Sequence, residues 1–126
     1  MTLEESYEIK TGEGFEDYFA SSLANSGFKI YTTPRSHDGG CDLIASIAGS
    51  TILCQVKQVR SNKVLSNGVE QILDARYRFE SADKLVLITN ARSVTKSQQE
   101  LARKASVIVI CGEAIENYGA FLARHL

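Results

Sequence analysis

The chain has 126 residues, a formal net charge of −1 and 44% hydrophobic residues, which fits a single globular domain with its own core. It contains no apolar run near the roughly 20 residues that a membrane-spanning helix requires. The acidic N-terminal segment lacks the apolar centre of a signal peptide. We therefore expect one cytoplasmic domain over residues 1–126 with no membrane partner.

Hydrophobic periodicity predicts an alternation of helices and strands along the chain. Helices are expected at 14–26, 69–79, 95–105 and 113–126, and strands at 28–33, 41–48, 51–59, 84–90 and 106–111. Residues 1–11 are left open as an N-terminal arm. The first three strands can meander antiparallel, whereas the last two follow helical crossovers and should run parallel to a neighbour. The expected fold is α/β, with a mixed central sheet flanked by helices on both faces.

The segment 38–57 is predicted to form a β-hairpin that gathers three polar side chains. Its Gly-Ser pair at 49–50 suits a two-residue type II′ turn, and the resulting register places Asp42 opposite Lys57. Gln55 lies two residues before Lys57 and therefore shares its face of the sheet. We expect Asp42, Gln55 and Lys57 to form one patch.

A carboxylate, an amide oxygen and an ammonium group in one patch can hold a divalent cation beside a phosphate. Mg²⁺ takes oxygen ligands and uses one or two carboxylates, so Asp42, Gln55 and the backbone carbonyl of Val56 are candidate ligands. Lys57 would orient an attacking water or offset charge on a phosphoryl oxygen. The alternative is an ordinary cross-strand ion pair between Asp42 and Lys57 on a solvated face.

Two side chains on the predicted helices are further candidates. Glu16 falls between Phe19 and Ala20 on a helical wheel, within an apolar stripe. A carboxylate there costs free energy unless a cation or charge meets it, so Glu16 is a candidate acidic partner of the hairpin site. It can equally be a glutamate that the dipole of the helix N-terminus favours. Gln71, on the flank of the next helix, either reaches the site or remains solvated.

Because the net charge is close to zero, affinity for nucleic acid has to come from local clusters of basic residues. The candidate DNA contacts are Arg35, Arg60, Lys63 and Lys96. Each of them can also be a solvated surface charge. The three cysteines have no metal-binding spacing and are expected to be buried, inert thiols.

Taken together, these motifs resemble the Mrr-like branch of the restriction-endonuclease-like superfamily, the PD-(D/E)xK nucleases. The resemblance spans roughly 12–122 and rests on 14–16 (GFE), 27–28 (GF), 38–43 (DGGCDL), 55–57 (QVK) and 87–90 (LITN). It implies the three-layer fold of that superfamily, in the element order αβββαβαβα.

The resemblance also implies an activity and a role for each site residue. The chain would be a Mg²⁺-dependent endodeoxyribonuclease of restriction or defence type, with Mn²⁺ as a substitute. Asp42 would be the metal-bridging carboxylate, Gln55 would occupy the Glu/Gln position, Lys57 would be the catalytic lysine and Glu16 the helical acid. Gln in place of Glu removes one negative charge, so metal binding would depend more on Asp42 and Glu16.

Mrr-like enzymes usually carry a separate DNA-reading domain, for which 126 residues leave no room. The implied partners are therefore DNA and either a second copy of the chain or a separate recognition subunit. Two other functions remain open. One is a nuclease resembling Holliday-junction resolvases, which a preference for branched DNA would reveal. The other is an inactive module of the same fold that binds nucleic acid or protein, against which the intact set of site residues argues.

Overall fold

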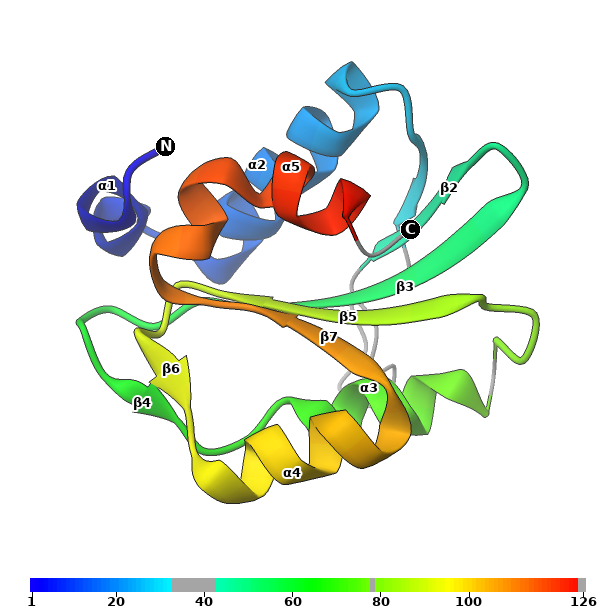
Figure 1. The fold of residues 1–126 in the computed structure, drawn as a ribbon. Helices are drawn as coiled ribbons and strands as arrows, with labels where there is room; N and C mark the ends of the chain where they lie inside the picture. The colour runs from blue at the N-terminus through cyan, green and yellow to red at the C-terminus, as the bar shows by residue number, and fades with distance from the viewer. Residues whose placement is uncertain (33–42, 78, 125–126) are drawn as a thin grey trace.

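The computed structural model describes residues 1–32, 43–77 and 79–124, and within them five strands form a mixed central sheet (Figure 1). The strands are β1 (Lys29–Thr32), β2 (Leu43–Ile47), β3 (Ser50–Lys57), β5 (Lys84–Thr89) and β7 (Val107–Ile110), in the spatial order β1-β2-β3-β5-β7. β2 runs antiparallel to both β1 and β3, whereas β5 pairs parallel with both β3 and β7. The predicted mixed sheet is confirmed.

Helices cover both faces of this sheet, which gives the three layers expected from the sequence (Figure 1). One face carries α1 (Leu3–Glu8), α2 (Gly12–Asn25), the 3-10 helix η1 (Gly112–Asn117) and α5 (Tyr118–Ala123). The other face carries α3 (Val69–Arg76) and α4 (Lys96–Ala105). A second, two-stranded parallel sheet joins β4 (Val64–Leu65) to β6 (Ser93–Val94) beside the helical layer. Among the described residues, no helix has the length and apolar character needed to cross a bilayer.

The two faces of β3 belong to two different hydrophobic clusters, because side chains alternate along a strand. Cys54 and Val56 pack under α2, where Phe15 and Phe19 are fully buried. Leu53 points the other way and packs with residues of α3, β5 and α4. Gln55 and Lys57 have the same parity as Leu53, so both lie on the α3 side of the sheet.

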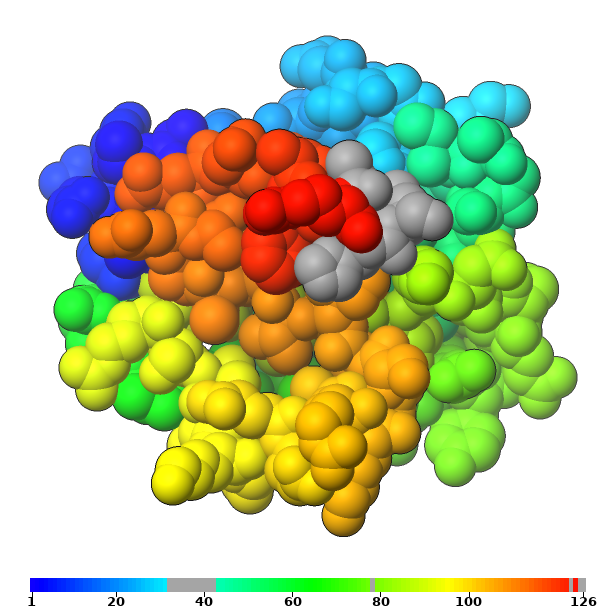
Figure 2. Space-filling model, in the orientation of Figure 1, coloured from blue at the N-terminus to red at the C-terminus, as the bar shows by residue number. Residues whose placement is uncertain are grey.

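Residues 1–8, left open as an arm, begin with a capped helix that packs against the domain. The Thr2 hydroxyl accepts a hydrogen bond from the Glu5 amide, and the Glu5 carboxylate accepts one from the Thr2 amide, which completes a capping box. The latter bond holds the pKa of Glu5 below its usual value. α1 lies directly against η1 (Figure 2), where the Leu3 amide donates to Glu116 Oε2 at 2.9 Å.

The hairpin between β2 and β3 turns one residue earlier than the sequence predicts. The central turn residues are Ala48 and Gly49, with φ values of 51° and 85°, and Ile47 pairs with Ser50. Positive φ at both positions is the pattern of a type I′ turn, which matches the twist of paired strands better than other turns. The predicted register is therefore wrong by two residues. A shift of two leaves every side chain on its face of the sheet.

Candidate functional site

The polar end of β3 lies under α3 at the C-terminal end of the parallel strands. Gln55 pairs with Leu87 of β5, and Lys57 pairs with Thr89. Both side chains lie on the α3 side, as their spacing of two residues predicts. Asp42, the third member of the predicted patch, lies outside the described residues, and so does Arg35.

Gln55 is a buried amide whose oxygen has no partner. Its side chain is only 8% exposed, and no donor among the described residues reaches Oε1. A buried acceptor left unsatisfied costs about 1–3 kcal/mol, so its persistence in a structure calls for an explanation. An amide oxygen is also a hard neutral ligand of the kind that Mg²⁺ accepts. The Gln55 oxygen is therefore compatible with a divalent cation or with a donor on a ligand.

The described residues do not complete a metal site by themselves. They contain no group of three or more His, Cys, Asp or Glu side chains placed to hold a metal ion. Asp42, the expected anionic ligand, belongs to the segment 33–42, which lies outside the described residues. The Val56 side chain packs on the opposite face, under α2, so only its backbone carbonyl remains a candidate ligand.

Lys57 ends β3 and is half-buried. Within the described part of the chain its ammonium group has no ion-pair partner. The chain just beyond it is held rigidly by Asn90, which is fully buried. The Val59 amide donates to Asn90 Oδ1 at 2.6 Å, and Asn90 Nδ2 donates to the Val59 carbonyl at 2.8 Å and to Ser6 Oγ at 2.9 Å. This network ties α1 to the ends of β3 and β5.

Two side chains that follow Lys57 hold the linker between α1 and α2. Gln58 Nε2 donates to the carbonyl oxygens of Ser6 at 3.1 Å and Ile9 at 2.8 Å. Arg60 donates to the carbonyl oxygens of Ile9 and Lys10. Arg60 is a predicted DNA contact; in this structure its guanidinium group bonds backbone of the chain and the side chain is exposed.

The structure does not bring Glu16 and Gln55 onto a common face. Glu16 is half-buried on α2, and the apolar stripe of α2 packs on the face of β3 opposite to Gln55. A helical wheel places a residue within a stripe but does not say which face of the sheet the helix covers.

The remaining predicted DNA contacts, Lys63 and Lys96, lie around the small second sheet together with a third basic residue, Arg92. Lys63 and Arg92 lie side by side, because the Arg92 amide donates to the Lys63 carbonyl at 2.9 Å. Lys96 opens α4 directly after Thr95, whose amide donates to the Leu65 carbonyl at 3.0 Å. All three basic side chains are exposed. They lie beyond the same strand ends as Lys57.

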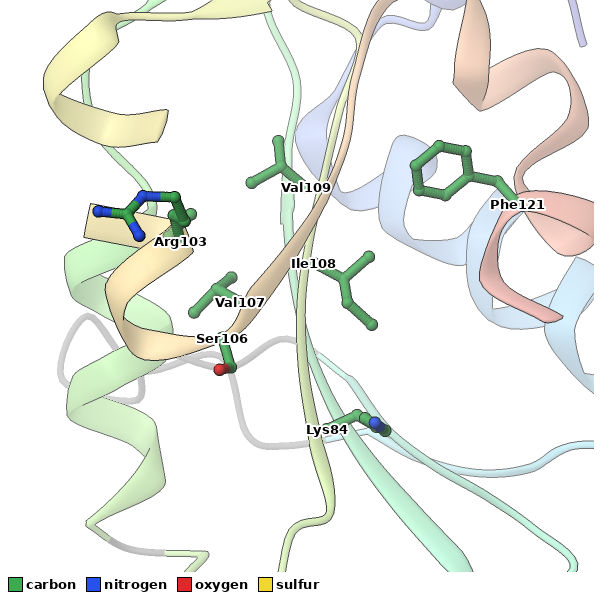
Figure 3. A pocket seen from close by; sticks show the side chains of 8 residues that line it. Lys84, Arg103, Ser106, Val107, Ile108, Val109 and Phe121 are labelled. Atoms are coloured by element: carbon green, nitrogen blue, oxygen red, sulfur yellow. The ribbon is translucent and has the colours of Figure 1, made fainter. Parts of the chain in front are cut away.

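The two cysteines that the structure describes and a surface hollow along β7 lie away from the Gln55 side chain. Cys54 is fully buried and faces α2, while burial raises the pKa of the Cys111 thiol. Cys41 is outside the described residues. A hollow of about 350 Å³ runs along β7, and Figure 3 shows Lys84, Ile108 and Phe121 among the residues that line it. β5 separates β7 from β3, so this hollow is distinct from the polar end of β3.

Comparisons with known proteins agree with the fold described above. A family model described as "Restriction endonuclease" (Mrr_cat) matches residues 9–118. The structure resembles AF1548, a protein of unknown function, with a TM-score of 0.65 and 13% identity, over 82% of this chain and 65% of that chain. It also resembles the MspJI restriction endonuclease, solved in complex with a 27-mer oligonucleotide, with a TM-score of 0.59 and 20% identity, over 89% of this chain.

These structural likenesses establish the fold, and the chain matches only part of the length of each similar protein. The chain spans 65% of the AF1548 chain and only 28% of the MspJI chain. No curated protein matches the sequence.

Proposed function

This chain belongs to the restriction endonuclease family, and from that premise we propose that it is a Mg²⁺-dependent endodeoxyribonuclease of restriction type, which hydrolyses phosphodiester bonds in DNA. The observation that supports the proposal most strongly is the unpartnered, buried oxygen of Gln55. It lies on the same face of β3 as the Lys57 ammonium group. An oxygen ligand and a positive charge on one face suit a cation and a phosphate bound side by side.

Asp42 is the proposed anionic ligand. Consecutive Cα atoms are about 3.8 Å apart, and Leu43, the next residue, pairs with Cys54 on β3. The proposal for Asp42 rests on this chain connection to Leu43, whose partner Cys54 directly precedes Gln55. The Val56 carbonyl and Glu16 are the other proposed ligands. Glu16 would approach from the start of α2, around the end of β3.

The bound Mg²⁺ would lower the pKa of a coordinated water and offset charge on the scissile phosphate, and Mn²⁺ should substitute for it. Lys57 acts as a hydrogen-bond donor in this scheme. Its ammonium group donates a hydrogen bond to a phosphoryl oxygen, where negative charge increases in the transition state. Water is the nucleophile, so no covalent intermediate with the protein is needed.

DNA is the proposed partner, and the basic residues around the second sheet are its proposed phosphate contacts. Lys63 and Lys96 are exposed there together with Arg92. Arg35 and Arg60 are kept as proposed contacts from the sequence. Each lysine that neutralises a phosphate should contribute about −0.9 to the slope of the logarithm of the DNA association constant against the logarithm of the salt concentration. A second copy of the chain or a separate recognition subunit is a further proposed partner.

Cleavage of defined DNA tests the proposed function. Supercoiled, linear and branched substrates are incubated with Mg²⁺, with Mn²⁺ or with EDTA. We expect cleavage with either cation and none with EDTA, and we expect Asp42→Ala to remove it. Lys104→Ala is the matched control, because Lys104 is exposed on α4 and pairs with Glu100. Equal cleavage by wild type and Asp42→Ala would exclude the site, and a strong preference for branched DNA would favour a junction-resolving role.

A further inference from the structure

A second amide oxygen, on α3, is buried without a hydrogen-bond partner in the described part of the chain, like that of Gln55. Among the described residues, the buried side-chain nitrogen and oxygen atoms without a hydrogen-bond partner are Gln55 Oε1 and Gln71 Oε1. The remaining buried glutamine of this layer, Gln98, is fully engaged: its oxygen accepts from the Val69 amide at 3.1 Å and its nitrogen donates to Glu70 Oε1 at 2.6 Å. The unpartnered state is therefore specific to Gln55 and Gln71, and is not common to glutamines in this layer.

The bonds of Gln98 fix the flank of α3 on which Gln71 lies. They place α4 beside Glu70, and α4 packs over β7. Successive helical residues are about 100° apart, and Val69, Ile72 and Ala75 face the sheet. Gln71 is thus on the flank turned away from α4. Because the strand order is β2-β3-β5-β7, that flank lies over β3 and β2.

The start of α3 lies at the level of Gln55 along the strands. A Cβ on Gly68, the residue before α3, would stand 3.1 Å from Leu87 Cδ1, and Leu87 pairs with Gln55. Gln71 lies about 4.5 Å from Gly68 along the helix axis. Helical side chains lean toward the N-terminus, which brings the Gln71 amide back toward Gln55.

We propose that Gln71 is a further residue of the cation site, where its amide oxygen binds the divalent cation, or one of the waters that the cation retains, next to the oxygen of Gln55. This inference rests on the proposed function. Two neutral oxygens without donors, buried on the same side of one strand, suit a hard cation that prefers oxygen ligands. In the cation-free protein they remain unsatisfied. Loss of the Gln71 oxygen should therefore stabilise the protein without cation and weaken cation binding.

Thermal unfolding with and without Mg²⁺ tests this pair of effects in the absence of DNA. Gln71→Met keeps the length of the side chain and removes the acceptor. We expect its melting temperature in EDTA to rise by about 3–5 °C, since an unsatisfied acceptor is removed from a domain of this size. The Mg²⁺ concentration that gives half of the thermal shift should rise about tenfold.

Two further variants distinguish an effect on cation binding from an effect on packing alone. Gln98→Met is the matched control: it breaks two hydrogen bonds, so it should lower the melting temperature in EDTA and leave Mg²⁺ affinity unchanged. Gln71→Glu adds a charge, so it should lower stability in EDTA and strengthen Mg²⁺ binding, because affinity follows the charge of the ligands. Side-chain amide NMR signals of Gln55 and Gln71 should broaden at lower Mn²⁺ concentrations than those of Gln98.

The outcomes distinguish this inference from the function on which it rests. A wild-type protein that neither responds to Mg²⁺ nor cuts DNA would overturn both. A wild-type protein that responds and cuts, together with a Gln71→Met variant of unchanged Mg²⁺ affinity, would overturn the assignment of Gln71 alone. A fall in the melting temperature of Gln71→Met in EDTA would also overturn it, because it would show that the amide already has a partner in the cation-free protein.

Discussion

Replacement of Asn90 by Ala should destabilise the domain severely, because one buried side chain joins three segments. Asn90 is fully buried and bonds the amide and the carbonyl of Val59, at 2.6 and 2.8 Å, and the hydroxyl of Ser6, at 2.9 Å. Ser6 retains its own bond to the Leu3 carbonyl at 2.5 Å. The two backbone groups of Val59 are therefore the ones left without a partner.

The size of the effect follows from those two groups. Val59 is 6% exposed, so solvent has little access to its amide and carbonyl. Each buried group left unsatisfied costs about 1–3 kcal/mol, so Asn90→Ala should lower the free energy of unfolding by about 2–6 kcal/mol. That loss is a large part of the roughly 5–15 kcal/mol typical of a domain.

Urea unfolding followed by circular dichroism measures this loss, since the chain contains no Trp. Asn25→Ala is the control: Asn25 is exposed at the end of α2, and its replacement should change stability by no more than about 0.5 kcal/mol. A double-mutant cycle of Asn90→Ala with Ser6→Ala should give a coupling energy of about 0.5–3 kcal/mol. A loss below about 1 kcal/mol in Asn90→Ala would refute the argument that this network holds α1 to the ends of β3 and β5.

Three other expectations test single features of the fold. Ala48→Asn should stabilise the protein by about 0.5–1 kcal/mol in urea unfolding, because Ala48 has a φ of 51° and Asn tolerates that conformation better. Gly112→Ala should destabilise it by more than about 2 kcal/mol, since the new Cβ would lie 2.8 Å from the Arg92 carbonyl oxygen at a φ of 57°. Burial raises the pKa of Cys111, so iodoacetamide at pH 8 should modify Cys111 at least about tenfold more slowly in folded than in urea-unfolded protein, as peptide mass spectrometry will show.

Much of the architecture follows from periodicity in the sequence. The apolar runs 84–90 and 106–111 are strands covered on both faces, and β5 and β7 occupy these runs in the structure. The position of the hairpin turn did not follow from the sequence, because Gly49-Ser50 suits a type II′ turn, whereas the structure turns at Ala48-Gly49 and places an alanine at positive φ. α1 was missed although Thr2 and Glu5 have the spacing of a capping box. Its short apolar pattern gave no periodic signal, and its partner Asn90 lies far along the chain.

The candidate site was predictable only in part. The common face of Gln55 and Lys57 follows from their spacing of two residues, whatever the register. A helical wheel does not show which face of the sheet a helix covers. The sequence therefore could not show that α2, which carries Glu16, packs on the face of β3 opposite to Gln55. The sequence alone does not show whether Gln71 is solvated or faces the site. That becomes clear only when the structure places α4 beside Glu70 on the other flank of α3. Arg60 was predicted from charge alone, and charge does not reveal bonds to backbone carbonyls.

The most direct test of the central claim is the initial rate of supercoiled-plasmid cleavage by Lys57→Ala relative to wild type in Mg²⁺. Loss of a group that stabilises charge in the transition state should lower the rate by about 10²–10³-fold, while Lys104→Ala should retain it within about twofold, because Lys104 is exposed on α4. A Lys57→Ala protein that cuts at the wild-type rate, or wild-type cleavage that persists in EDTA, would contradict the assignment of this end of β3 as a cation-dependent nuclease site.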